Sequence, residues 1–369
     1  MFEALFGAAG WVVLPAWAGL SLSPWLGQRV RVAIWAVTGR GVPLVLGAVY
    51  LALLLAYWPV EGGGYGSLAA VRTLFGHDGT LLAGWMHFLA FDLFVGTWMA
   101  REGMRLGLPR ALLVPCFLLA FWFGPVGLLA FFALRAWPWV KRAAGELLRR
   151  QPQLAGFGML LLALLLPAAM AAWLDPRTLA GVDVWAKPMK FLAAIGLYAL
   201  TLAWLIGELP AVRRHTRLVR AVVGVVLLTG MFEAVYITWQ GALGQPSHFN
   251  LSTPFHAAMY SLMGLAALVF TSMSLPVAHQ LWRHGDGMAP AYRLGAIAGL
   301  LLTFLAGAGM GVAISMNGGP WVGGAGGSGL PIVGWSTSVG DLRAPHFLGV
   351  HAQQLLPAAG WLLARGAGR

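Results

Sequence analysis

The chain has 369 residues, of which 59% are hydrophobic and only 10% charged, and its mean hydropathy is +0.76. A soluble domain carries charge on roughly a quarter of its residues, so this composition excludes a soluble globular protein and predicts a membrane protein with the bilayer as its main partner. The net charge of +12 does not indicate nucleic-acid binding, because the basic residues lie in short loops between apolar runs without a basic stripe or a recognised module.

About ten apolar runs are long enough to cross a bilayer, which predicts an all-α, polytopic helical membrane protein. No basic residue precedes the first run, so we expect a retained span rather than a cleaved signal peptide. Cys116 is the only cysteine, which excludes an intramolecular disulfide and thiolate-held metal clusters and favours a small buried hydrophobe. The expected spans cover residues 6–23, 40–58, 83–100, 111–136, 155–174, 189–206, 219–238, 255–278, 292–315 and 345–364.

The third expected span places an imidazole, His87, and a carboxylate, Asp92, inside an otherwise apolar stretch. Ionisable groups at this depth are energetically costly and usually functional. At about 100° per residue the two side chains are roughly 140° apart around a helix, so they are expected to border one cavity from adjacent sectors. We predict an acid–base pair. The alternative is a buried polar pair that hydrogen-bonds neighbouring helices.

Residues 137–153 interleave basic side chains with Trp and Leu, which is typical of an amphipathic helix at the membrane interface. This linker separates a four-span domain, residues 1–136, from a six-span domain, residues 154–369, in a 4+6 arrangement. The basic loops of the six-span domain lie on the side of the C-terminus, which predicts a cytoplasmic C-terminus in a bacterial inner membrane. Ten spans place the N-terminal arginines on the other side, a conflict that a re-entrant segment at 111–136 would remove.

Glu233 is a second carboxylate at apparent mid-membrane depth, within the seventh span. It is expected either to be protonated and act as a proton donor, or to form a hydrogen bond that joins two helices. Lys187 and Lys190 begin the sixth span and are expected to extend toward the interface.

The segment QPSHFNLSTPFH, residues 245–256, gathers His248, Asn250 and His256 beside good helix-capping residues. It indicates either a capped loop or a site for a polar head group, a quinone or a metal. In the last span, His346 and His351 are five residues apart, so they do not face one metal from one helix, and Gln354 adds a polar group.

A Gly-rich loop, residues 317–340, contains the pattern GxGxxG. A dinucleotide site needs a strand before this pattern and a helix after it, whereas here a membrane span precedes it and a proline follows. We therefore expect a flexible lid over a membrane-facing cavity rather than a nucleotide site.

The first 136 residues resemble the plant and cyanobacterial membrane family named for abscisic acid deficiency, the neoxanthin synthase-like family. The strongest matching run contains Trp85, His87 and Asp92, and Gly124 with Pro125 belongs to a second motif. The resemblance implies conversion of an epoxy-carotenoid to an allenic one, an isomerisation that needs an acid and a base but no net electron transfer. The C-terminal motifs KPMKF, SHFNLSTP and PHFLGVHAQQ resemble uncharacterised bacterial membrane proteins.

We therefore predict an integral membrane protein that binds or isomerises a carotenoid-like or other isoprenoid lipid, with no cofactor and no metal. The expected catalytic residues are His87, Asp92 and Glu233. One alternative is a haem b- or quinone-linked electron-transfer protein that uses the histidines. Another is a proton-coupled transporter or sensor that uses Glu233. The expected substrate contacts are Trp85, His248, Asn250, His256, His346, His351 and Gln354.

Overall fold

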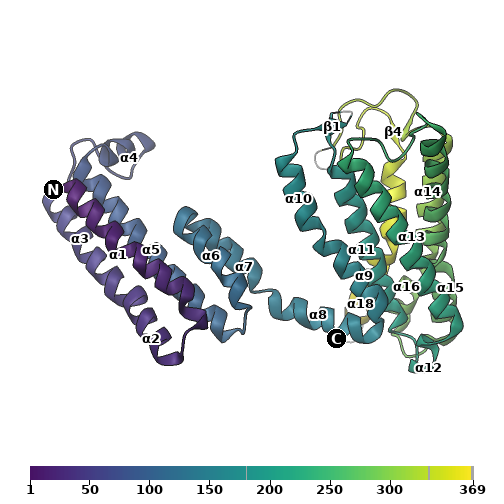
Figure 1. Cartoon of the computed structure of the whole chain (residues 1–369), viewed down its shortest axis with the longest axis horizontal. Helices are drawn as coiled ribbons and strands as arrows, with labels where there is room; N and C mark the ends of the chain where they lie inside the picture. Colours follow the sequence, from purple (N-terminus) through teal and green to yellow (C-terminus); the bar gives the residue numbers. More distant parts are fainter. Residues whose placement is uncertain (180, 331–332, 367–369) are drawn as a thin grey trace. The chain divides into compact units, whose positions relative to one another are not determined.

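The computed structural model describes residues 1–179, 181–330 and 333–366, and nearly all regular structure in them is helical (Figure 1). Within these ranges, eight helices are long and apolar enough to cross a membrane. The predicted all-α helical membrane fold is confirmed, whereas the count of ten spans in a 4+6 arrangement is not. The strands found in the described ranges form two short antiparallel hairpins, β1 (Thr178–Leu179) with β2 (Val182–Asp183) and β3 (Trp321–Val322) with β4 (Gly340–Asp341).

The chain divides into two compact units, Met1–Ala143 and Ala144–Arg369, here called the N-terminal and C-terminal units. The division falls inside the basic segment 137–153, which forms helix α8 (Trp137–Arg150). Each unit has its own hydrophobic core.

The long helix α5 (Asp78–Arg105) organises the N-terminal unit and contributes much of its buried core. Its close approach to α1 (Phe2–Leu22) depends on Gly96, where a Cβ would lie 2.6 Å from the Trp17 ring. Thr97 of α5 and Thr38 share a buried hydrogen bond of 2.8 Å. The other elements before α5 are α1 (Phe2–Leu22), η1 (Ser23–Trp25), α2 (Gln28–Ala36), the π-helical segment η2 (Val37–Gly41), α3 (Val42–Tyr57) and α4 (Leu68–Phe75).

The fourth expected span is a helical hairpin rather than one membrane-crossing helix. Helix α6 (Arg110–Phe123) ends at Gly124, which has a φ of 44°, and α7 (Pro125–Leu134) begins at once. Residue conformations of this kind favour glycine, and proline suits a first helical turn. After α7, Arg135 lies 3.6 Å from Glu102 in the last turn of α5. The hairpin therefore returns the chain to the C-terminal end of α5, near which α6 begins. The expectation of a single span over 111–136 is therefore corrected.

The C-terminal unit packs its helices around α11 (Ala186–Ile206), whose Leu202 and Ala203 are fully buried. Helices α16 (Pro290–Leu302) and α18 (Arg343–Gly366) can approach closely because Gly299 has no Cβ, which would otherwise collide with the backbone of Ala352 and Gln353. The other helices are α9 (Pro152–Ala163), α10 (Leu165–Leu174), α12 (Ala211–Arg214), α13 (Arg217–Ala242), α14 (Pro254–Ser272), α15 (Ser274–His284), α16 (Pro290–Leu302), the π-helical η3 (Thr303–Ala308), α17 (Gly309–Met316) and α18 (Arg343–Gly366).

The last expected span corresponds to α18, which has 24 residues. At about 1.5 Å per residue it is long enough to cross a bilayer. It is absent from the eight apolar candidates of the described chain because histidines, glutamines and arginines lower its hydropathy. The structure therefore differs from the ten-span expectation at the broken helix over 111–136, whereas α18 agrees with the last expected span by its length.

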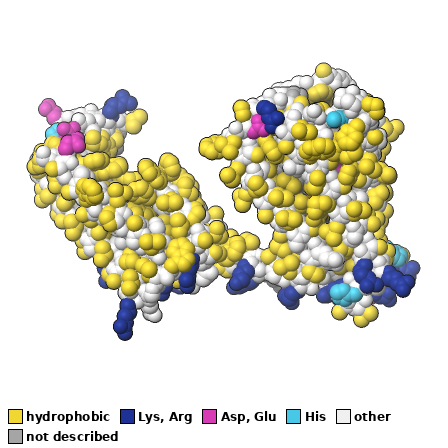
Figure 2. All heavy atoms as spheres, in the orientation of Figure 1, with side chains coloured by type: hydrophobic (Ala, Val, Ile, Leu, Met, Phe, Trp, Pro, Cys, Tyr) yellow, Lys and Arg dark blue, Asp and Glu magenta, His cyan; other side chains and the backbone are white. Residues whose placement is uncertain are grey.

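The surfaces of both units are rich in outward-facing apolar side chains, and most of the visible Lys and Arg side chains lie near one end of each unit, with a few at the opposite end (Figure 2). Trp11 and Trp173, for example, are 83% and 86% exposed. An apolar belt with charges confined to the ends is the pattern expected of helices immersed in lipid.

Candidate functional site

Asp92 lies on α5 and is half-buried, with its carboxylate directed at the break between α6 and α7. A Cβ added to Gly124 would lie 3.1 and 3.2 Å from the two carboxylate oxygens. Among the described residues, the buried Oδ2 atom of Asp92 has no hydrogen-bond partner and no cation forms a salt bridge with it. A buried carboxylate oxygen left in this state is energetically costly, so it calls for a proton or for a donor on a bound molecule.

Asp92 lies against Gly124 at the start of α7 and shares its face of α5 with aromatic side chains. Gly124 is at once the C-cap of α6 and the N-cap of α7, so Asp92 faces the junction of the two helix ends. Trp85 is seven residues before Asp92 and therefore on the same face of α5. Its ring centroid lies 5.3 Å from Phe88 and 5.6 Å from Phe6. The expected substrate contact Trp85 thus shares a helix face with Asp92.

His87 lies on a different face of α5 and is exposed at the surface of the N-terminal unit. Its ring stacks on Phe91 at 4.4 Å and lies 5.7 Å from the Tyr50 ring of α3. No hydrogen bond joins His87 to Asp92 in the part of the chain that the structure describes. The structure therefore separates the two groups around α5, and their acid–base partnership stays a prediction.

A second polar cluster lies in the C-terminal unit, on one face of α13. Glu233, Tyr236 and Gln240 are each at least 96% buried. The Glu233 Oε1, the Tyr236 hydroxyl and the Gln240 Oε1 have no hydrogen-bond partner among the described residues. The charge of Lys187, at the start of α11, acts on Glu233, although no salt bridge joins the two in the described structure. Lys187 was expected at the interface, but it is partly buried and faces this cluster.

His248 follows α13 in the loop and joins the same cluster. Its ring lies 5.4 Å from Phe191 and 6.3 Å from Tyr260, and its Nδ1 is 3.1 Å from the Ser247 hydroxyl. Burial, with the nearby charge of Lys187, lowers the pKa of His248 to about 3, so the ring is neutral at physiological pH.

Asn250 and His256 hold the loop itself. The amide nitrogen of Asn250 donates to the Pro246 carbonyl at 3.1 Å, and its oxygen accepts from the backbone and hydroxyl of Ser252. His256 Nε2 lies 3.2 Å from the side-chain oxygen of Gln245. The capped-loop interpretation explains these two side chains, and their substrate contacts remain untested.

The polar residues of α18 form a third group. His346 Nδ1 donates to the carbonyl of Gly307, in the π-helical η3, at 2.7 Å. The His351 ring lies 4.3 Å from Phe347, and the Gln354 amide donates to the Thr201 hydroxyl at 3.0 Å. Gln353, fully buried, has both side-chain polar atoms unpartnered among the described residues, although it was not one of the expected site residues. The described chain holds no group of three His, Cys, Asp or Glu side chains placed to bind a metal.

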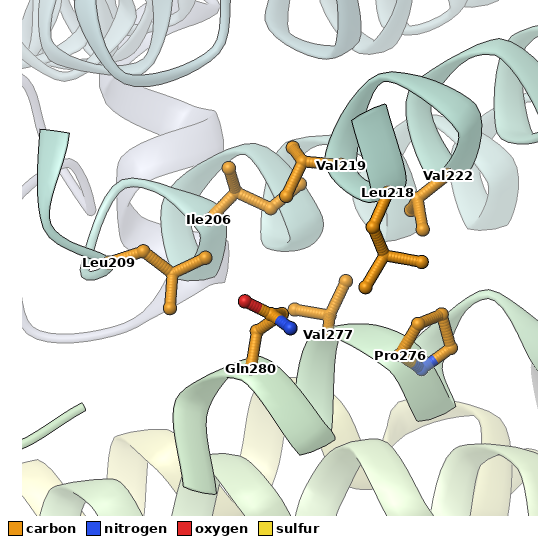
Figure 3. A pocket seen from close by; sticks show the side chains of 8 residues that line it. All are labelled: Ile206, Leu209, Leu218, Val219, Val222, Pro276, Val277 and Gln280. Carbon is orange, nitrogen blue, oxygen red and sulfur yellow. The ribbon is translucent and has the colours of Figure 1, made fainter. Parts of the chain in front are cut away.

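Two cavities lie away from all of these residues. One is a shallow recess between α11, α13 and α15, lined by apolar side chains and by Gln280 (Figure 3). It leaves no space for a water molecule, so it is a packing defect rather than a ligand site. The second has a volume of about 240 Å³ and lies at the basic end of the C-terminal unit.

The described parts of the Gly-rich loop are tied down by hydrogen bonds. Arg343 pairs with Asp341 at 2.6 Å and donates to the Gly334 carbonyl at 2.7 Å, and Asp341 also accepts from the Ser336 backbone. Arg343 and these donors lower the pKa of Asp341 to about 2. Residues 331 and 332, inside the expected lid, lie outside the described residues.

The fold defines a polytopic α-helical membrane protein. Residues 4–131 match the model of a family described as ABA4-like (ABA DEFICIENT 4-like), so the N-terminal unit contains a segment of that family and the resemblance found in the sequence is confirmed for it. No curated protein and no solved structure matches the chain. The structure adds that the two motifs behind the resemblance meet, since Asp92 of one faces Gly124 of the other.

Proposed function

We propose that the N-terminal unit binds a carotenoid-like or other isoprenoid lipid within the membrane and exchanges a proton with it at Asp92. The observation that carries this proposal is the buried, unpartnered Oδ2 of Asp92 at the Gly124 helix break. A lipid hydroxyl would donate to the ionised carboxylate, and an epoxide oxygen would accept from the protonated one, in both cases without bringing water into the membrane.

The neighbouring aromatic rings support an apolar, flat ligand. Trp85 and Phe88 stack on the Asp92 face of α5, and Trp17 of α1 packs edge-on against Phe121 of α6 at 5.7 Å. Aromatic faces of this kind bury large apolar areas and suit a conjugated chain. The match to the ABA4-like family supports the same ligand class, through the chemistry that the resemblance implies.

An isomerisation at this site needs one proton donated to an epoxide oxygen, which breaks a C–O bond, and one proton removed from carbon, with no net electron transfer. Asp92 is the group proposed to handle the proton at the helix break. His87 is the second proposed group, reached from the exposed, aromatic side of α5.

The test compares Asp92→Asn with the matched control Asp78→Asn, at the start of the same helix, in protein purified from a carotenoid-producing bacterium. We expect the wild type and Asp78→Asn to carry an extractable isoprenoid or pigment and Asp92→Asn to lose it or to leave it unconverted. A folded Asp92→Asn protein with unchanged ligand content and turnover would refute the proposal.

The cluster around Glu233 favours a second candidate function, proton-coupled transport or sensing by the C-terminal unit. A buried carboxylate beside a lysine and two unpartnered polar groups is the arrangement expected of a proton-binding site in a membrane. In proteoliposomes with an internal pH dye and an imposed membrane potential, the wild type should admit protons and Glu233→Gln should not. Equal flux in both proteins would remove this candidate.

The haem- or quinone-linked alternative stays an untested prediction, because His346 and His351 contact protein groups in the described structure and nothing there points to such a ligand. A Soret band in the purified protein would support it.

We also infer the orientation in a bacterial inner membrane. The chain leaves the N-terminal unit beside Glu102, at that unit's basic end, and enters the C-terminal unit at Arg150, beside Glu208. If the hairpin does not cross the membrane and α18 does, the basic ends of both units lie on one side, and the positive-inside rule then predicts a cytoplasmic C-terminus. A green fluorescent protein fused to the C-terminus should fluoresce, and one fused after residue 66 should not.

A further inference from the structure

The second cavity lies where three helices of the C-terminal unit meet, at the end of α8, the end of α11 and the short α12. It is lined by Glu146, Arg149, Arg150, Gly207 and Arg214. Its volume of about 240 Å³ far exceeds the roughly 10–15 Å³ that one water molecule needs. No residue assigned above to ligand binding or proton transfer contributes to it.

Arg150 lines the cavity, and its contacts fix its position. Its guanidinium bonds Glu146 at 2.7 Å and Glu208 at 2.6 Å, and it lies 3.9 Å from the centre of the Trp204 ring. Gly207 makes this position accessible, because a Cβ there would collide with the Arg150 side chain. Arg150 is thus held in place by charge, stacking and shape together.

Arg149 and Arg214 are only partly satisfied by protein groups. The Arg149 side chain is 77% exposed and pairs only with Glu146 in the described structure. Arg214 donates through Nε to the Leu209 carbonyl at 2.8 Å, and no described residue bonds its two terminal nitrogens. Three guanidinium groups therefore face two carboxylates, Glu146 and Glu208, which leaves an excess of positive charge at the cavity.

The cavity also lies at the level of lipid head groups. It adjoins the C-terminal end of the spanning helix α11, and the spanning helix α13 begins three residues after Arg214. Trp204 is 38% exposed beside it, as is common for tryptophans at the membrane interface. Basic pockets between transmembrane helices at this depth bind anionic head groups.

We propose that this cavity binds the phosphate of an anionic phospholipid head group. Arg214 and Arg149 contact the phosphate, and Arg150 forms the wall of the cavity against which it lies. The shared chemistry is a phosphate monoanion, and its source is the surrounding bilayer leaflet. This site is separate from the ligand site at Asp92 and does not depend on it.

The experiment measures thermal unfolding of the full chain in a neutral detergent with added dioleoyl phosphatidylglycerol, dioleoyl phosphatidylcholine or inorganic phosphate. We expect phosphatidylglycerol to raise the Tm in a saturable way, and phosphatidylcholine and phosphate at equal concentration to have no such effect. Arg214→Gln should weaken the apparent affinity for phosphatidylglycerol by roughly fivefold. Arg149→Gln should do the same where Arg214→Gln fails to fold.

Arg283→Gln is the matched control, because Arg283 is a basic residue of the same unit that does not line the cavity. Its affinity for phosphatidylglycerol should equal that of the wild type. Equal loss in the control and in Arg214→Gln, or no loss in either cavity variant, would overturn the proposal. An equal response to inorganic phosphate would overturn the lipid as the source.

Discussion

Asp92 and Glu233 are both carboxylates inside membrane-spanning helices, but their surroundings differ. Asp92 faces a glycine at a broken helix, with no cation paired to it among the described residues, whereas Glu233 is influenced by the charge of Lys187 and neighbours other buried polar groups. The Asp92 carboxylate therefore needs either a proton or a hydrogen bond from a bound molecule. The Glu233 carboxylate is partly balanced by the protein itself. The same residue type therefore predicts a ligand site in one unit and a charge-coupled site in the other.

The largest expected effect follows from removing the cation of the C-terminal cluster. Lys187→Met leaves Glu233 buried without its balancing charge and should destabilise the protein by roughly 3 kcal/mol, measured by thermal unfolding in detergent. The double variant Lys187→Met with Glu233→Gln should recover most of that loss. If the double variant is as unstable as the single one, the two groups are not coupled.

The next effect concerns the helix break that Asp92 faces. Gly124→Ala places a Cβ 3.1 Å from the carboxylate, at a φ of 44° that L-residues rarely adopt. We expect a loss of about 1–3 kcal/mol of stability and a loss of bound lipid. Gly47→Ala is the control in the same unit, because a Cβ there meets nothing within 4 Å. Equal behaviour of the two variants would show that the break is not strained.

A smaller effect, of opposite sign, distinguishes the two carboxylates. Replacing Asp92 by Leu removes an unpartnered buried oxygen, so lipid-free protein should gain about 1 kcal/mol of stability while it loses ligand binding. Glu233→Leu should instead destabilise, because it leaves Lys187 unbalanced. A loss of stability in Asp92→Leu would indicate that the carboxylate has a structural partner.

The helices and the two carboxylates follow directly from the sequence, because long apolar runs have few alternatives in lipid and an intramembrane charge is conspicuous. The hairpin follows from it only as the re-entrant alternative for 111–136, because this run is apolar up to Arg135 and long enough for one span. The pair Gly124–Pro125 was the available signal, because glycine ends helices and proline begins them.

The role of Lys187 depends on tertiary structure. A lysine in the first turn of a spanning helix looks the same whether it extends to the interface or turns inward. Its inward position is defined by Glu233 on α13 and by His248 in the following loop. Helical spacing alone separates His87 from Asp92 around α5, but their different neighbours, Tyr50 of α3 for His87 and Gly124 for Asp92, are likewise decided by packing.

The smallest expected effect concerns Asp341, a carboxylate outside the membrane-spanning helices, in contrast to Asp92 and Glu233 inside them. The pKa of Asp341 is lowered from 3.8 to about 2 by its hydrogen bonds with Arg343, so its contribution to stability is fully present above about pH 4 and is lost as the pH falls through 2. Asp341→Asn should therefore cost about 0.5 kcal/mol at pH 7 and less at pH 2, measured by thermal unfolding at both values. Asp286→Asn is the control, because the Asp286 side chain is 81% exposed and its pair with Arg293 should contribute little at either pH. If the difference between Asp341→Asn and the wild type is the same at both pH values, the ion pair does not anchor the Gly-rich loop, and the hydrogen bonds to Gly334 and Ser336 lose their proposed support.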